Sequence, residues 1–151
     1  MLQLQRTDSN NPDFRELVKH LDAELAQWYG AEQSFYAQFN RVDTIKQVVV
    51  AYEGATAVSC GAIRLVSEGV MEVKRMYTLP EMRGKGIAGK LLAELERWAT
   101  ELGCRQCILE TGKKQPEAIR LYEKSGYGPI PNYGQYVGKD YSVCFAKELI
   151  K

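Results

Sequence analysis

The chain has 151 residues, 45% of them hydrophobic and 26% charged, values typical of a globular protein. Twenty lysines and arginines stand against nineteen aspartates and glutamates, which leaves a net charge of +1 and argues against nucleic acid as the main partner. No apolar run approaches the ~20 residues of a membrane-spanning helix, and the start of the chain lacks a signal-peptide core. We therefore expect one cytoplasmic domain over residues 1–151, with no membrane partner.

The first part of the chain predicts a strand and two helices. Leu2 to Gln5 alternates apolar and polar residues, as a strand does. Asn10 or Asn11 provides a cap and Pro12 a first-turn proline for a helix, and apolar residues follow at helical spacing until Gly30. The aromatic residues of Gln33 to Phe39 share a face, which predicts a second, short helix.

Three strands joined by tight turns are predicted next. They cover Gln47 to Ala51, Ala57 to Val66 and Val70 to Thr78, and Pro80 ends the third. The short turn at Glu53 favours a hairpin between the first two strands. This part of the sheet is therefore expected to be antiparallel.

The second half alternates helices and strands. An apolar stripe from Ile87 to Ala99 predicts a helix, Cys107 to Leu109 a strand, and Pro116 the start of another helix. A loop-rich stretch, Gly128 to Gly138, precedes a last strand, Tyr141 to Ala146. The strand–helix–strand order implies a parallel strand pair. The sequence thus predicts an α/β (α+β) fold: a mixed, mostly antiparallel sheet with helices on both faces.

The most informative segment, Met82 to Lys90, reads M-R-G-K-G-I-A-G-K and lies between a predicted strand and a predicted helix. It satisfies G-x-G-x-x-G, most of G-x-x-x-x-G-K-[ST], and [RQ]-x-x-G-x-[GA], which are three phosphate-binding patterns. The residues that carry them are Arg83, Gly84, Gly86, Ala88, Gly89 and Lys90. In each pattern, backbone N–H groups at a helix start favour a bound anion.

Two of the three patterns fit poorly. A P-loop nucleotidase needs a hydroxyl group after the lysine, where this chain has Leu91. A dinucleotide fingerprint needs a strand that runs directly into the first glycine, but Leu79 to Arg83 intervene. The third pattern is the pyrophosphate loop of acyl-CoA-dependent acetyltransferases.

Two segments in the expected order support the third pattern. Glu72 to Tyr77 followed by Leu79 to Ala88 resembles the fourth strand and pyrophosphate loop of the GNAT superfamily of N-acetyltransferases, and Ala118 to Tyr127 resembles its A-x-x-L-Y-x-x-x-G-F motif. Gln115 departs from the asparagine that the family often has three residues before that alanine. The resemblance implies a GNAT-like fold in which the parallel strand pair splays apart.

The resemblance also implies an activity and a donor. It predicts transfer of an acetyl group from acetyl-CoA to a primary amine of a small molecule or peptide by direct attack. The implied cofactor-binding residues are Met76, Thr78, Arg83, Gly84, Lys85, Gly86, Ile87, Ala88 and Gln115. Two alternatives stay open: a non-catalytic CoA-binding regulatory module, which the Gln115 departure motivates, and a nucleotide-binding protein.

Candidate catalytic residues come from the same resemblance. Tyr122 is the candidate acid toward the CoA thiolate, and Glu72 the candidate base, acting through water. Glu110, at the end of the following strand, is a rival base, and either carboxylate could be an ordinary surface group. His20, the only histidine, is expected on the surface of the first helix.

Other chemistry-bearing residues have simpler interpretations. Cys104 and Cys107 form a C-x-x-C, but without a thioredoxin-like context we expect buried structural thiols and no metal site. Tyr133 and Tyr136 in the tail either touch substrate or pack the sheet. The sequence leaves monomer and homodimer open.

Overall fold

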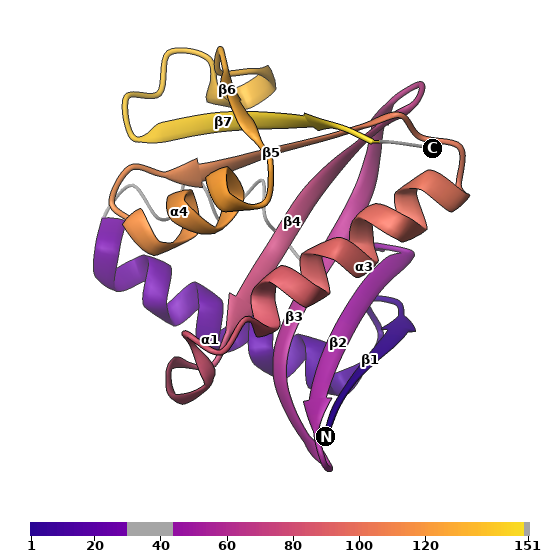
Figure 1. Ribbon diagram of the computed structural model, residues 1–151. Helices are drawn as coiled ribbons and strands as arrows, with labels where there is room; N and C mark the ends of the chain where they lie inside the picture. The colour runs from indigo at the N-terminus through magenta and orange to yellow at the C-terminus, as the bar shows by residue number, and fades with distance from the viewer. Residues whose placement is uncertain (30–43, 150–151) are drawn as a thin grey trace. The chain divides into compact units, whose positions relative to one another are not determined.

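The computed structural model describes residues 1–29 and 44–149 (Figure 1). In chain order the elements are β1 (Leu2–Thr7), α1 (Pro12–Tyr29), β2 (Gln47–Glu53), β3 (Thr56–Ser67), β4 (Val70–Thr78), the 3₁₀ turn η2 (Pro80–Met82), α3 (Ile87–Glu101), β5 (Gln106–Gly112), α4 (Pro116–Lys124), β6 (Gly128–Ile130), the 3₁₀ turn η3 (Gly134–Tyr136) and β7 (Ser142–Glu148). The strands form a seven-stranded mixed sheet in the order β1-β2-β3-β4-β5-β7-β6, in which β4 and β5 are parallel.

The predicted fold class is confirmed, with one strand more than the sequence indicated. β6 lies in the stretch predicted as loop, where Gly128 and Pro129 are poor strand formers. It is a strand because it pairs antiparallel with β7. The predicted helix Gln33 to Phe39 and the predicted helix end at Gly30 fall outside the described residues.

Contacts divide the chain into two compact units. Unit 1 comprises residues 1–64 and 74–95, and unit 2 comprises residues 65–73 and 96–151. The division falls within β3, β4 and α3, so each of these elements contributes to both units. The single-domain organisation expected from the sequence stays a prediction.

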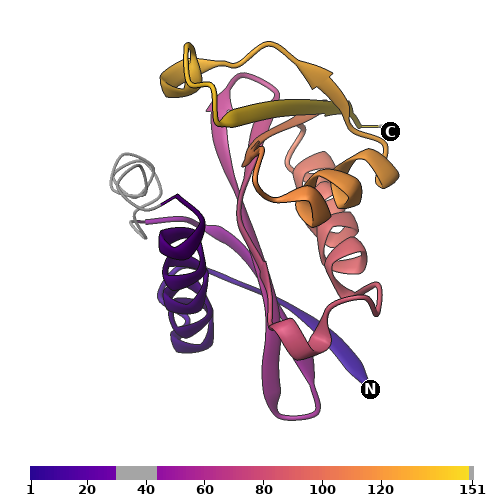
Figure 2. The same cartoon turned by 90° about the vertical axis from the view of Figure 1, so that its left-hand side faces the viewer.

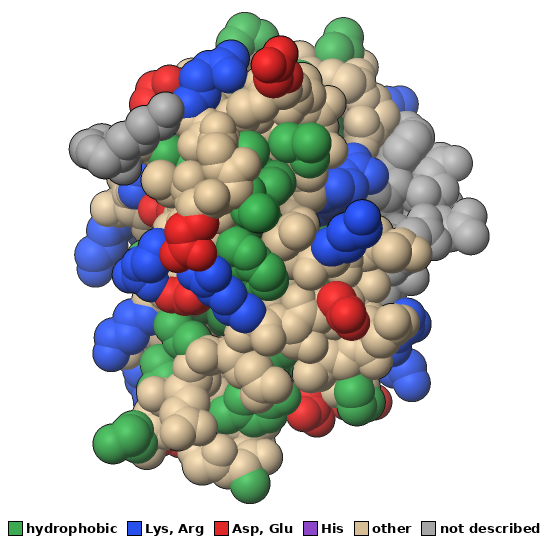
Figure 3. All heavy atoms as spheres, turned by 90° about the vertical axis from the view of Figure 1, so that its right-hand side faces the viewer, with side chains coloured by type: hydrophobic (Ala, Val, Ile, Leu, Met, Phe, Trp, Pro, Cys, Tyr) green, Lys and Arg blue, Asp and Glu red, His purple; other side chains and the backbone are tan. Residues whose placement is uncertain are grey.

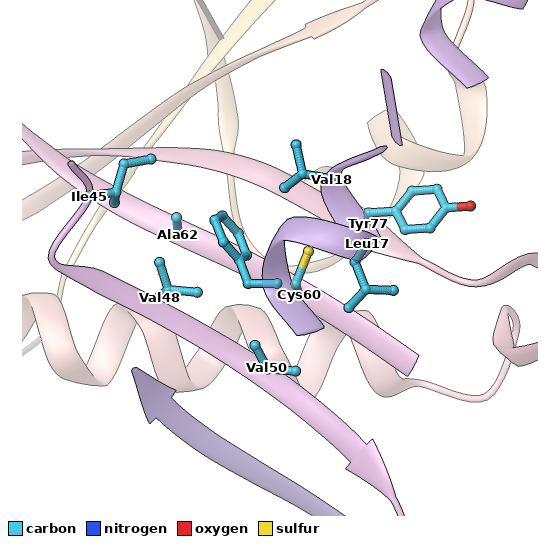
Figure 4. Close-up of a cluster of buried hydrophobic side chains, with 9 residues drawn as sticks. Leu17, Val18, Ile45, Val48, Val50, Cys60, Ala62 and Tyr77 are labelled. Carbon is cyan, nitrogen blue, oxygen red and sulfur yellow. The ribbon is translucent and has the colours of Figure 1, made fainter. Parts of the chain in front are cut away.

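The core of unit 1 lies between α1 and the β2–β3 hairpin. The predicted cap is present, because the N–H group of Phe14 donates to Asn11 Oδ1 at 2.9 Å and Pro12 is the first helical residue. The apolar stripe of α1 then packs against the strands (Figure 4). The buried residues of this cluster are Phe14, Leu17, Val18, Ile45, Val48, Val50, Cys60, Ala62 and Tyr77.

The other face of the hairpin is covered by the start of α3. Cys60 and Ala62 point into the α1 cluster, so Gly61 between them faces the opposite way. A Cβ atom at Gly61 would collide with the Met76 and Leu91 side chains, so the absence of a side chain at Gly61 lets these residues pack directly on the strand. Within unit 1, α1 and α3 thus lie on opposite faces of β2 and β3 (Figures 1 and 2).

Unit 2 is built around β5. A parallel ladder joins Val70–Val73 of β4 to Gln106–Leu109 of β5, and β7 pairs antiparallel along the other side of β5. On one face, the Tyr122 ring of α4 lies 6.4 Å from the Phe145 ring of β7. β6 continues this part of the sheet beyond β7 (Figure 1).

The surface carries charges of both signs. On the face drawn in Figure 3, acidic side chains lie among the basic ones, in keeping with the balanced composition. None of the helices in residues 1–29 and 44–149 has the length and apolar character needed to cross a membrane.

Candidate active site

The predicted phosphate loop lies in unit 1, between the end of β4 and the start of α3. Gly84 and Gly86 have φ angles of 79° and 80°, in the left-handed region that only glycine adopts without strain. A Cβ atom at either glycine would meet no heavy atom within 4 Å, so the backbone faces open space there. This part of the loop can therefore admit a ligand directly against its backbone.

The backbone N–H groups at this point suit an anion. The helical ladder of α3 starts with the N–H of Lys90, which donates to the carbonyl of Gly86 at 3.2 Å. N–H groups that precede such a ladder point out of the helix end and favour negative charge. Ile87 is buried and anchors the helix start in the core. Residues 84–88 thus fit a diphosphate group by shape and by charge.

The two cationic side chains of the loop differ in their surroundings. The Arg83 guanidinium donates to both carboxylate oxygens of Glu24 and to the carbonyl of Thr78. Lys85 is exposed, and its Nζ lies 3.9 Å from Met82 Sδ. Of the two cationic side chains predicted to bind the anion, Lys85 is therefore the more exposed.

The end of β4, where cofactor contacts were predicted, is joined to β3 by side-chain hydrogen bonds. The Thr78 and Ser59 hydroxyl oxygens lie 2.8 Å apart, and Ser59 Oγ also donates to the Tyr77 carbonyl at 2.9 Å. Met76 points toward α3, since it is one of the side chains nearest to Gly61. Arg75 is buried with a φ of 61°, a strained conformation for a non-glycine residue. Such strain is concentrated at functional sites.

The two candidate bases lie on one face of the sheet in unit 2. Glu72 pairs with Ile108 across the parallel ladder, and Glu110, two residues beyond Ile108, faces the same side. Cys144 opposes Glu110 on β7 and shares that face. The side chain of Glu72 is buried, which excludes the surface interpretation for this carboxylate.

A phenol from the tail holds Glu72. The hydroxyl group of Tyr133 donates to Glu72 Oε2 at 2.6 Å, a short charge-assisted hydrogen bond. The Tyr133 ring meets the Tyr136 ring edge to face, with centroids 5.7 Å apart. The side-chain amide of Asn132 lies 3.1 Å from both the Tyr136 and Lys139 carbonyls, which fixes this segment. Hydrogen bonds and ring packing within residues 132–139 therefore hold Tyr133 against the Glu72 carboxylate.

Burial and nearby negative charge keep the phenol groups of Tyr133 and Tyr136 protonated. Burial first, then the Glu72 carboxylate, raises the pKa of Tyr133 well above its usual range. Burial, followed by the Glu110 and Glu72 charges, raises the pKa of Tyr136. Both tyrosines are therefore hydrogen-bond donors at any ordinary pH.

Tyr122, the candidate acid, is buried on α4. Burial, and to a smaller extent the Glu110 carboxylate, raises its pKa above the ordinary value. Its ring packs edge to face on Tyr127, with centroids 5.9 Å apart. A phenol in these surroundings stays protonated at neutral pH, as a proton donor must.

Gln115, the position where the sequence departs from the family motif, stabilises a turn in the structure. It precedes the first residue of α4, and its Oε1 accepts a hydrogen bond from the Gly112 N–H at 3.2 Å. The same oxygen lies 3.4 Å from Thr111 Oγ1. Gln115 thus connects the end of β5 to the start of α4.

Two further predictions from the sequence are confirmed. His20 is half exposed on α1, stacked on Tyr77 and 3.7 Å from Glu16. All four cysteines are buried free thiols, and burial raises the pKa of both Cys60 and Cys107 to about 12. Such thiols are packing groups with little thiolate character.

Sequence reasoning missed two contacts that shape these sites. The Tyr133–Glu72 bond joins residues 61 positions apart, and the Arg83–Glu24 pair joins residues 59 apart. The available signal was indirect: tyrosines concentrated in the tail, and an arginine within the loop motif. No local pattern names the partner of either residue.

A family model described as "Acetyltransferase (GNAT) family" matches residues 7–127. This chain belongs to the GNAT acetyltransferase family. It is therefore an acyltransferase, and acetyl-CoA is the acetyl donor that enzymes of this family use.

Individual relatives agree with the family match. An IAA acetyltransferase of Azospirillum brasilense is 34% identical over 136 residues, 89% of each chain. The uncharacterized N-acetyltransferase YjgM of Escherichia coli K12 is 33% identical over 137 residues, 82% of this chain and 80% of the other. A crystal structure from Klebsiella pneumoniae, described as an acyl-CoA N-acyltransferase, is similar with a TM-score of 0.83, 31% identity and 99% of each chain covered.

Proposed function

We propose that this protein transfers the acetyl group of acetyl-CoA to a primary amine of a small molecule or peptide. The observation that carries the proposal is the open, positive-φ glycine loop at the start of α3, in a chain whose residues 7–127 match the GNAT family. The relatives named N-acetyltransferase or N-acyltransferase support an amine nitrogen as the acceptor.

The phosphate loop of unit 1 would hold the donor. The pyrophosphate would lie against the backbone N–H groups of Gly84 to Ala88, and Lys85 would add positive charge. Backbone groups near Met76 and Thr78 would hydrogen-bond to the pantetheine arm, much as a neighbouring strand would. Gln115 would contribute by fixing the β5–α4 turn.

Glu72 and Tyr122 of unit 2 would carry out the two proton transfers of the reaction. The bound donor supplies a thioester, which the amine attacks directly. Glu72, buried and held by Tyr133, would accept the proton that the amine loses, through a water molecule. Tyr122 would donate its phenolic proton to the departing sulfur. Glu110 shares the face of Glu72 and is the alternative proton acceptor.

The test is thiol release from acetyl-CoA in the presence of a panel of primary amines. The proposal expects acceptor-dependent release by the wild-type protein and a large fall in rate for Tyr122→Phe. Tight CoA binding with no release across a broad panel would instead support a regulatory module. Thermal stabilisation by NAD or ATP, and none by CoA, would support the nucleotide-binding alternative, because a ligand that binds only the folded state raises its stability.

A further inference from the structure

The arginine of the loop motif, Arg83, is bonded to residues of unit 1. Arg83 Nη1 and Nη2 lie 3.1 and 2.8 Å from the two carboxylate oxygens of Glu24, a residue of α1. Arg83 Nε donates to the Thr78 carbonyl at 2.8 Å. The guanidinium carbon also lies 5.4 Å from the centre of the Tyr77 ring. A bidentate carboxylate fixes a guanidinium group in orientation as well as in position.

These contacts close the connection between β4 and α3. The N–H groups of Met82 and Arg83 donate to the carbonyls of Leu79 and Pro80, which folds residues 79–83 into a compact turn. The bond from Arg83 to Thr78 joins the two ends of that turn. Glu24 then ties the turn to α1, so the residue immediately before Gly84 cannot move independently.

Residues 84–88 would be flexible without contacts that hold them in place. Gly84 and Gly86 have left-handed φ angles, and glycine has more backbone freedom to lose on ordering than any other residue. A loop that must be ordered by its ligand binds more weakly than one already held in the bound conformation.

We propose that Glu24 is a positioning residue for the phosphate loop: through Arg83 it holds residues 84–88 ready for the pyrophosphate, so that Arg83 acts as a brace rather than as a phosphate ligand. The Glu24 carboxylate, the Tyr77 ring and the Thr78 carbonyl all contact the Arg83 guanidinium, and all three belong to unit 1. This inference rests on the proposed function for its ligand, CoA.

The two roles for Arg83 predict opposite effects of removing Glu24. If Arg83 is a brace, Glu24→Gln loosens the loop and weakens CoA binding by up to about fivefold, as expected for a partly exposed ion pair. If Arg83 binds phosphate, the same substitution releases its charge toward the ligand, and CoA binds as tightly as before or more tightly. The sign of the change distinguishes the two.

The experiment combines calorimetry with limited proteolysis on the full chain. CoA dissociation constants are measured for wild type, Glu24→Gln, Glu24→Ala, Arg83→Ala and the double alanine variant. If Arg83 is a brace, the two single alanine variants and the double variant should lose similar CoA affinity. The second substitution then removes a contact that the first has already broken. Glu16→Gln is the matched control, since Glu16 is an exposed glutamate of the same helix, 3.9 Å from Lys19, and we expect it to leave affinity unchanged.

Trypsin cleavage after Lys85 supplies a readout that needs no ligand. Cleavage should be several-fold faster in Glu24→Gln than in wild type or Glu16→Gln, while circular dichroism stays unchanged. Equal cleavage rates, or tighter CoA binding by Glu24→Gln, would overturn the brace. Failure of wild type to bind CoA, with faster cleavage still seen in Glu24→Gln, would overturn the proposed function and leave the brace in place.

Discussion

The two units contribute different kinds of chemistry. In unit 1 the proposed donor site is made of backbone: the amides around Gly84 and Gly86 face open space, while the loop arginine is bound to the unit's own residues. In unit 2 the proposed catalytic groups are side chains: buried Glu72, bonded to Tyr133, and buried Tyr122 on α4. Binding of the donor should therefore be sensitive to backbone conformation in unit 1, and turnover to single polar atoms in unit 2.

The largest effect is expected in unit 2. Tyr122→Phe removes one oxygen, and with it the proton donor, so kcat should fall about 10²–10⁴-fold. CoA affinity and melting temperature should hardly change, because the ring still packs on Tyr127 and Phe145. Steady-state kinetics and calorimetry measure the two quantities separately. Unchanged kcat would remove Tyr122 from the reaction.

The next largest effect is expected in unit 1. Gly86→Val places a β-branched residue at a φ of 80°, which costs about 1–3 kcal/mol and should weaken CoA binding roughly 5- to 150-fold. Gly89→Ala is the matched control, because Gly89 lies in α3 without a positive φ and a Cβ there would meet nothing within 4 Å. Equal losses in both variants would show that the glycine conformation is not what binds CoA.

A smaller effect is expected from the tyrosine that holds the candidate base. Tyr133→Phe removes the hydrogen bond to Glu72, and kcat should fall about tenfold while the KM for acetyl-CoA stays constant. Tyr141→Phe, at a partly exposed ring beside Lys114, should leave kcat unchanged. A change in KM for acetyl-CoA alone would place Tyr133 in donor binding instead.

The smallest effect concerns stability at high pH. Burial raises the pKa of Tyr136 in the folded protein, whereas in the unfolded chain it ionises near its usual value of about 10. Its stabilising contribution is complete below pH ~10 and is lost as the pH rises through the folded-state pKa. Urea unfolding from pH 8 to 11 should show a shallower decline for Tyr136→Phe than for wild type. Identical declines would contradict the assigned burial.

The difference between a backbone site in unit 1 and a side-chain site in unit 2 explains what the sequence could predict. Met82 to Lys90 was informative because a backbone that must bind an anion needs glycine at fixed local spacing, and local spacing is visible in one sequence. The sheet and the parallel pair β4–β5 followed from hydrophobic periodicity and element order. β6 was missed because its Gly-Pro sequence gives no strand signal, and only pairing with β7 makes it a strand.

The surroundings of the side chains could not be predicted. Glu72 lies on a strand whose residues alternate in an ordinary way, and nothing nearby in sequence distinguishes a buried carboxylate from an exposed one. Its hydrogen-bond partner Tyr133 follows five intervening elements of the chain. The partners of Arg83 depend in the same way on how α1 packs in unit 1.

Calorimetric titration of coenzyme A into the wild-type protein and into Gly86→Val tests the account most directly. We predict saturable binding at one site in the wild type and a loss of at least fivefold in the variant, because the proposed diphosphate site consists of amides in a backbone conformation that favours glycine. Absence of binding by the wild type, or equal affinity in the two proteins, would contradict it.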